Sequence, residues 1–241
     1  MLLNSAKGLF FWNNWHPEVA IRYLPVVAQI KKIGISPSVL DVGSGGLGIA
    51  PYIGYSVTGV DLRFRPPYHS RLQRIKASAA NLPFADSSFD AVISVDTFEH
   101  MSLTDREKAI REMVRTARKL VIIAVPCGKE SYRQDKELHR FYRKKFKKKY
   151  RFFEEQLKLG LPEESEMIKI INQIRKDLNS GFRLQVLDNE NLKLREFLMK
   201  GWMTKNIFTD IFFRKILLTA IPVFVNINSP PVYRKIFIIR K

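Results

Sequence analysis

The sequence is poor in the features that define several classes of protein. A single cysteine, Cys127, occurs in 241 residues, so no disulfide can form within the chain, as is usual in a reducing cytosol. The longest apolar stretch, residues 216–227, contains Pro222 and is shorter than the ~20 residues that span a bilayer. Asn4 and Asn13 interrupt the first apolar runs, unlike in a signal peptide. We therefore expect a cytoplasmic protein without a transmembrane helix.

Some site chemistries also lack their residues. One cysteine and four histidines do not form the clusters that zinc requires, so we expect no metal. Acidic residues are few as well: 23 Asp and Glu stand against 41 Lys and Arg, a net charge of +18. Such an excess favours an anionic partner, namely nucleic acid, a membrane surface or a phosphorylated substrate. A basic but inert surface is the alternative.

Short apolar runs alternate with amphipathic segments along the first half of the chain. This alternation predicts βαβ units and a parallel sheet. The runs are almost continuously apolar, which is typical of strands covered on both faces. We expect strands at residues 39–42, 55–60, 74–77, 91–95, 120–125, 181–187 and 233–239, and helices at residues 17–33, 104–118, 163–179 and, with a break near Gly201, 192–218.

The strongest local signal is residues 39–48, VLDVGSGGLG, a strand that ends in a glycine-rich turn. Glycines allow positive φ and let a ligand approach the backbone closely. Gly43, Gly45 and Gly48 match the dinucleotide pattern G-x-G-x-x-G, which by itself is weak. Asp41 would repel a diphosphate but could hold a cationic ligand group. An NAD-dependent oxidoreductase is therefore an alternative, although a less favoured one.

Three segments carry a resemblance to a known family. Asp41-x-Gly43-x-Gly45 is followed by VTGVD at residues 57–61, a second strand that ends in Asp61. Residues 78–90 read SAANLPFADSSFD, and residues 98–101 read FEHM. Together they resemble class I S-adenosylmethionine-dependent methyltransferases, most closely the subgroup of ubiquinone and menaquinone biosynthesis methyltransferases, with its D-A-x-x-L-P-F-x-D-x-S-F-D stretch and L-E-H segment. The resemblance covers residues 38–126.

This resemblance implies a Rossmann-like α/β fold, with a seven-stranded, mostly parallel sheet and a helical insertion after the fifth strand. It implies S-adenosylmethionine as cofactor, S-adenosylhomocysteine as product and SN2 transfer of the sulfonium methyl group. Two positions depart from the family: Ser78 replaces the Asp that accepts from the adenine amino group, and Leu47 replaces the third glycine. The implied cofactor contacts are Asp41, Gly43, Ser44, Gly45, Gly46, Asp61 (to both ribose hydroxyls), Leu62, Ser78, Ala79 and Ser94 (through its backbone carbonyl).

No catalytic residue is assigned, but three are candidates. Glu99 and His100 follow the fourth strand, and His139 lies beside the most basic stretch. A histidine near an acceptor can serve as a general base. Alternatively, these residues hold the loops in place. A sulfonium donor needs little electrophilic help, so a dedicated acid or base can be absent. We expect the acceptor between the N-terminal segment and residues 127–160. A small or lipid-linked acceptor (glycan, quinone or lipid headgroup) is favoured. An RNA methyltransferase and an inactive basic docking protein are alternatives.

The positive charge is concentrated in one segment. Residues 129–151 hold 11 Lys or Arg and 3 Asp or Glu, whereas residues 38–100 hold 5 and 6. Within residues 138–153 the side chains of Leu138, Tyr142, Phe146, Tyr150 and Phe153 recur at helical spacing. Three roles for this segment are open. It can be a helix docked on the core, it can contact an anionic membrane, or it can bind nucleic acid, although stacking on bases would need free aromatic side chains. The expected units are an N-terminal helical segment (1–36), a cofactor-binding core (37–128), a basic helical insertion (129–180) and C-terminal helices with the last strands (181–241).

Overall fold

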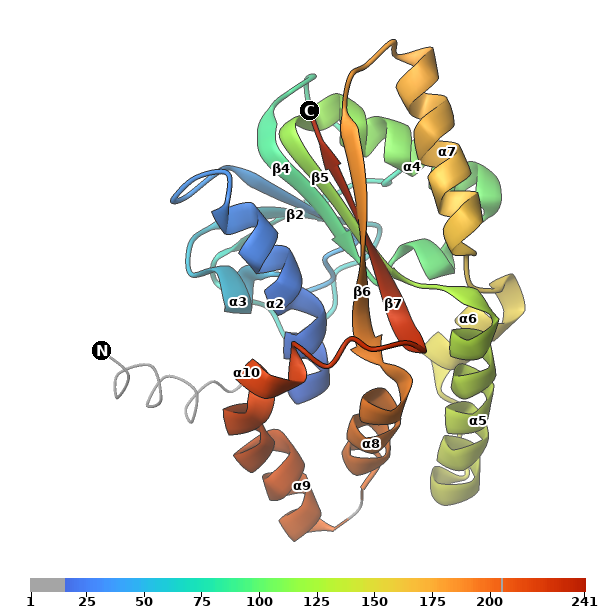
Figure 1. Ribbon diagram of the computed structural model, residues 1–241. Helices are drawn as coiled ribbons and strands as arrows, with labels where there is room; N and C mark the ends of the chain where they lie inside the picture. The colour runs from blue at the N-terminus through green and yellow to red at the C-terminus, as the bar shows by residue number, and fades with distance from the viewer. Residues whose placement is uncertain (1–15, 205) are drawn as a thin grey trace.

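A seven-stranded sheet forms the centre of the molecule (Figure 1). The computed structural model describes residues 16–204 and 206–241, so residues 1–15 of the predicted N-terminal segment lie outside it. The strand order is β3-β2-β1-β4-β5-β7-β6, and β7 runs antiparallel to both of its neighbours while the other pairs are parallel. The predicted Rossmann-like sheet is confirmed. The strands are β1 (Val39–Val42), β2 (Val57–Asp61), β3 (Leu72–Lys76), β4 (Phe89–Val95), β5 (Ala117–Pro126), β6 (Arg183–Asn191) and β7 (Val232–Arg240).

Helices cover both faces of this sheet. The α2 helix (Pro17–Lys31) and the short α3 (Ala50–Ile53) lie on one face, together with η2 (Ile216–Ala220) and α10 (Ile221–Phe224). The α4 helix (Leu103–Thr116) and α7 (Glu164–Asp177) lie on the other. Because both faces are covered, the side chains of β1 are buried along its whole length, as its continuous apolar run predicts.

The helical insertion after β5 differs from the single helical stripe that the sequence predicts for residues 138–153. The α5 helix (Gly128–Phe146) ends at Lys147, which has φ +56°, and α6 begins four residues later (Arg151–Leu159). Aromatic side chains from both helices nevertheless pack on α8 (Leu192–Trp202), where the Tyr150 and Trp202 ring centroids lie 5.5 Å apart. The periodicity is real, but a tight turn interrupts it without changing the surface on which the aromatics pack.

The chain continues from α8 into α9 (Ile207–Arg214), η2 and α10 before β7 returns to the sheet (Figure 1). None of the helices in the described part of the chain is both long and apolar enough to cross a membrane.

The strand order reverses between β1 and β4, which are adjacent in the sheet. In open α/β sheets, ligands bind beyond the carboxyl ends of the strands at such a reversal. The loops after β1 and β4 meet at this point, and the second of them contains η1 (Phe98–His100).

Candidate active site

The glycine-rich turn after β1 is held tightly against its neighbours. The amide of Gly43 donates to the carbonyl of Val60 at 2.7 Å. A β-carbon on Gly43 would lie 2.2 Å from Oγ1 of Thr97, and one on Gly48 would lie 2.4 Å from Oδ2 of Asp41. Only glycine fits such close approaches. Gly48, one residue after Leu47, therefore packs closely on Asp41.

Gly45 is different, because it faces open space. It has φ +57°, and a β-carbon there would meet no atom within 4 Å. Its amide donates to Oδ2 of Asp61, at the end of β2, at 2.9 Å, while the backbone amide of Arg63 donates to Oδ1 at 2.9 Å. Each carboxylate oxygen has a second lone pair, so Asp61 can accept two more hydrogen bonds. The turn thus offers open backbone beside a carboxylate with unused acceptor capacity.

Asp41 is buried beneath the turn with one oxygen satisfied. Its Oδ2 accepts from the amide of Ile49 at 2.7 Å, but its Oδ1 has no hydrogen-bond partner among the described residues. Burial raises the pKa of Asp41 to about 7, against the opposing effect of the Ile49 amide, and the charge of Asp61 adds to the increase. A buried oxygen without a partner is costly. A cationic ligand group near this carboxylate would relieve that cost.

The other predicted contacts have varied surroundings. Leu62 is 67% exposed, so its side chain is accessible to a ligand beside Asp61. Ser78 accepts from the amide of Ala80 at 3.2 Å, next to the half-buried Ala79. Ser94 is fully buried, and its hydroxyl donates to the carbonyl of Val42 at 2.8 Å. That hydroxyl links β1 to β4, so any ligand contact of Ser94 would have to use its backbone.

Two residues of the turn face protein instead of open space. Ser44 is buried, and its hydroxyl donates to the carbonyl of Gly45 at 3.2 Å. Gly46 lies under the next loop, since a β-carbon on it would come within 2.3 Å of the carbonyl oxygens of Arg65 and Pro67. Gly46 therefore determines how closely that loop packs on the turn.

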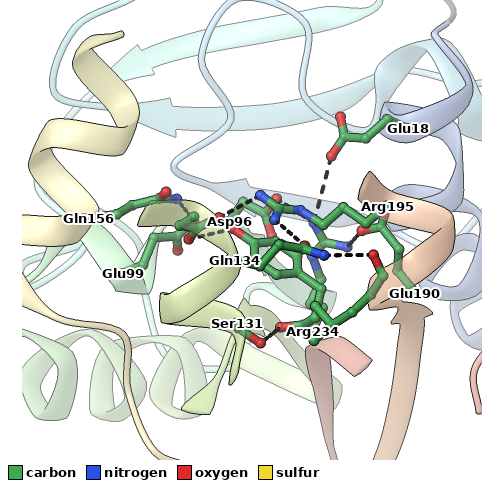
Figure 2. A network of polar contacts seen from close by, with 12 residues as sticks. Glu18, Asp96, Glu99, Ser131, Gln134, Gln156, Glu190, Arg195 and Arg234 are labelled. Carbon is green, nitrogen blue, oxygen red and sulfur yellow. Dashed lines mark hydrogen bonds and ion pairs between the residues drawn. The ribbon is translucent and has the colours of Figure 1, made fainter. Parts of the chain in front are cut away.

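A buried ion cluster adjoins the turn at the end of β4 (Figure 2). Asp96 has φ +50° and lies directly before Thr97, the residue that packs on Gly43. Its two oxygens accept from Nε and Nη2 of Arg234 at 2.6 and 2.8 Å, and Nη1 of Arg22 lies 2.8 Å from Oδ2. Burial acts to raise the pKa of Asp96, but the charges of Arg234 and Arg22 outweigh it and hold that pKa to about 2.

The cluster extends from this carboxylate into the last strands. Arg234 is fully buried on β7 and also donates to Oε2 of Glu190 at 2.9 Å. Burial raises the pKa of Glu190 to about 7, even though the charge of Arg234 lowers it. Arg195 pairs with Asp135 at 2.7 Å and stacks on the ring of Tyr233 at 3.3 Å. We use the term "buried ion cluster" for Glu18, Arg22, Asp96, Asp135, Glu190, Arg195 and Arg234.

The predicted candidates Glu99 and His100 lie next to this cluster. Glu99 is fully buried, its Oε1 accepts from Nε2 of Gln156 at 3.4 Å, and its Oε2 has no hydrogen-bond partner within residues 16–204 and 206–241 (Figure 2). Burial, and then the charge of Asp96, raise the pKa of Glu99 to about 8. Nε2 of His100 is 3.9 Å from Glu99, and burial lowers the pKa of His100.

The third candidate, His139, is held by a different set of contacts. His139 lies on α5 within the aromatic cluster, with its ring centroid 6.0 Å from that of Phe153, and burial lowers its pKa. Its surroundings are those of a residue that packs α5 against α6.

Sequence reasoning missed the buried ion cluster. Asp96 follows a predicted strand in the same way as Asp61, a signal that could have identified it. Arg234 is a cation inside the apolar strand predicted at residues 233–239, and such a residue is buried only when it is paired. The separation of these residues along the chain hid their common partner.

Comparison with known proteins agrees with this geometry. Residues 40–125 match a model of the family described as "Methyltransferase domain". The protein is an S-adenosylmethionine-dependent methyltransferase. The matched segment runs from β1 to the end of β5 and therefore contains the glycine-rich turn, Asp61, Asp96 and Glu99.

Solved structures with low sequence identity share the fold. A plantazolicin methyltransferase in complex with S-adenosylhomocysteine has a TM-score of 0.57 at 11% identity, over 93% of this chain and 85% of its own. Magnesium protoporphyrin IX methyltransferase from Synechocystis PCC 6803, with bound S-adenosylhomocysteine, has a TM-score of 0.53 at 13% identity, over 93% of this chain and 83% of its own. Phosphoethanolamine N-methyltransferase 2 from Haemonchus contortus, in complex with S-adenosylmethionine, has a TM-score of 0.51 at 19% identity, over 90% of this chain and 52% of its own.

Proposed function

We propose that this protein transfers a methyl group to a small or lipid-linked acceptor at the carboxyl ends of β1 and β4. The observation that carries the proposal is the open face of Gly45 beside the Asp61 carboxylate, at the point where the strand order reverses. When bound there, S-adenosylmethionine supplies an electrophilic sulfonium methyl group. Its sulfur would take the electron pair of the broken carbon–sulfur bond when the acceptor nucleophile forms its new bond to the methyl carbon.

The residues around the turn fit such a cofactor. The second lone pairs of the Asp61 oxygens suit the two ribose hydroxyls, and charge-assisted hydrogen bonds are the stronger kind. The unsatisfied Oδ1 of Asp41 suits the cationic methionine end. Leu62, Ser78 and Ala79 would surround the adenine, with the Ser78 hydroxyl as a neutral replacement for the usual carboxylate. The remaining predicted contacts, Gly43, Ser44, Gly46 and Ser94, would shape the turn or use backbone groups.

We propose that Glu99 accepts the proton that the methyl acceptor loses. It follows Thr97, which packs on Gly43, by two residues, so it lies close to the cofactor turn. Its free Oε2 can accept the proton that the nucleophile loses as the new bond to carbon forms. His100, 3.9 Å away, would position this carboxylate, and His139 is assigned no part in the step.

The acceptor we favour is a quinone, a glycan or a lipid headgroup. Residues 78–90 and 98–101 support the quinone, because they resemble the ubiquinone and menaquinone subgroup. RNA is less suitable, since most aromatics of residues 138–153 pack in the cluster on α8, and Phe152 is the one exposed aromatic side chain in this range that could stack on a base. The similar structures name a porphyrin, phosphoethanolamine and plantazolicin, so the shared fold leaves the choice of acceptor open.

Calorimetry with S-adenosylhomocysteine and with NAD tests the cofactor site. We expect saturable binding of S-adenosylhomocysteine and no binding of NAD. The reverse result would overturn the proposal, since it would place a dinucleotide on the turn. A screen for transfer of a radiolabelled methyl group to quinols, lipid extracts and RNA then identifies the acceptor class.

A further inference from the structure

One side of α9 is apolar and exposed. Ile207, Phe208, Ile211 and Phe212 recur at the spacing of a single helix face, and they are 69, 79, 49 and 39% exposed. Phe213 points the other way and packs so closely on α8 that a β-carbon on Gly201 would collide with its ring. The helix is therefore docked through one face and displays the other. We name as the exposed apolar face Ile207, Phe208, Ile211 and Phe212.

A basic hollow lies at the end of α5. Its volume is about 540 Å³. Lys149 pairs with Glu154 at 3.2 Å, and it is the one lining residue with an ion-pair partner among the residues described. The other cations are thus available to an anion. The lining residues are Arg140, Arg143, Lys144, Lys147, Lys148 and Lys149.

These two features flank α8. Both α5 and α9 contact that helix, and Figure 1 shows α5, α8 and α9 extending together from one end of the sheet. Residues 138–153, which were predicted to contact a membrane, contribute cations to the basic hollow. Most of their aromatic side chains, however, pack on α8. The apolar part of such a contact is found on α9 instead.

We propose that the exposed apolar face and the basic hollow together dock the protein on the surface of an anionic membrane. The apolar side chains of α9 would enter the boundary between headgroups and acyl chains, while the cations of the hollow pair with lipid phosphates. A second copy of this chain fits the surface poorly, because it would bring a second basic hollow, on a chain of net charge +18, against the first. The proposal rests on the proposed function in one respect: docking would bring a lipid-linked acceptor to the enzyme.

Sedimentation with phosphatidylcholine vesicles, with and without phosphatidylglycerol, tests the proposal. We expect the full chain to sediment with the anionic vesicles and to be released by salt. The double variant Ile207→Ser/Phe208→Ser should bind at least ~10-fold more weakly, since it loses two large apolar contacts. Lys144→Ser/Lys147→Ser should weaken binding to anionic vesicles alone. Ile35→Ser, which changes a 98% exposed residue after α2, is the matched control and should bind like the wild type.

Several results would overturn the proposal. The proposal is wrong if the wild type does not bind vesicles, or if the α9 variant binds them as well as the control does. It is also wrong if the variants lose affinity for RNA while their vesicle binding is unchanged, or if the α9 variant converts a dimer into monomers. Calorimetry with S-adenosylhomocysteine on the same samples separates the two proposals. Unchanged cofactor binding with failed docking leaves the methyltransferase site intact.

Discussion

Arg234 holds both carboxylate oxygens of Asp96, through Nε at 2.6 Å and Nη2 at 2.8 Å, although the two residues belong to β7 and the end of β4. Asp96 adjoins the residue that packs on the glycine-rich turn. The last strand of the sheet therefore helps to fix the geometry of the candidate cofactor site.

Replacement of Arg234 should strongly destabilise the fold. Arg234→Ala leaves Asp96 and Glu190 buried without their main cation, and removal of one partner of a buried ion pair costs ~3–5 kcal/mol. Urea unfolding measures the change. Arg118→Ala is the control, because Arg118 is 55% exposed and pairs with Asp90 at the surface, where such pairs contribute less than ~1 kcal/mol. Equal losses in the two variants would contradict the importance of the cluster.

Asp61→Ala should weaken binding of S-adenosylhomocysteine by ~1–3 kcal/mol, or up to about 100-fold, because hydrogen bonds to a charged group are lost. Calorimetry measures the affinity. Asp86→Ala is the matched control: its carboxylate is 78% exposed and pairs with Arg115 outside the turn. If both variants bind like the wild type, Asp61 does not contact the ribose.

Gly43→Ala should abolish cofactor binding or the fold of the turn. Its β-carbon would lie 2.2 Å from Thr97, a collision in addition to the cost of positive φ, which is ~1–2 kcal/mol. Gly54→Ala separates the two effects, since Gly54 has φ +87° but no atom within 4 Å of the added carbon. Thermal unfolding and calorimetry should show a much larger loss in Gly43→Ala. Similar losses would mean that the Thr97 contact relaxes easily.

The pH dependence of methyl transfer should report Glu99. A general base must be ionised, so with a pKa of about 8 the rate should rise from pH 7 to 9. Glu99→Gln should lower the rate ~100-fold or more and remove this rise, while Asp86→Ala keeps the wild-type profile. The acceptor found in the radiolabel screen serves for the assay. A profile that is the same in Glu99→Gln would show that Glu99 takes no proton.

The pH dependence of the free energy of unfolding should report the ionisation of Glu99 without any substrate. Between the ordinary pKa of 4.5 and about 8, folded Glu99 retains a proton that the unfolded chain has released. The unfolded state then binds fewer protons, so the free energy of unfolding falls as pH rises through this window. Glu99→Gln, which resembles the protonated form, should reduce that fall in urea titrations at pH 5 and pH 8. An identical pH dependence in both proteins would place the pKa of Glu99 near its ordinary value.

The sheet and its glycine-rich turn could be predicted because their signals are local. Val39–Val42 is an apolar run that ends in glycines, and its bounds were predicted correctly. Asp96 carries a local signal, but its ion pairs could not be predicted, since Arg22 and Arg234 reach it from opposite ends of the chain. The break at Lys147 was missed because the aromatic spacing continues across it. Periodicity records which side chains face the core, and it does not record where one helix ends.

The strand order also has a consequence for the assembly of the chain during synthesis. β6 emerges from the ribosome before β7, yet its one neighbour in the sheet is β7. Until β7 inserts, β6 has no place in the sheet, and β5 presents an unpaired edge of the kind that promotes aggregation. The same insertion delivers Arg234 to Asp96. Completion of the sheet and pairing of Asp96 with Arg234 are therefore one event, so the buried ion cluster beside the candidate site is complete only after β7 is in position.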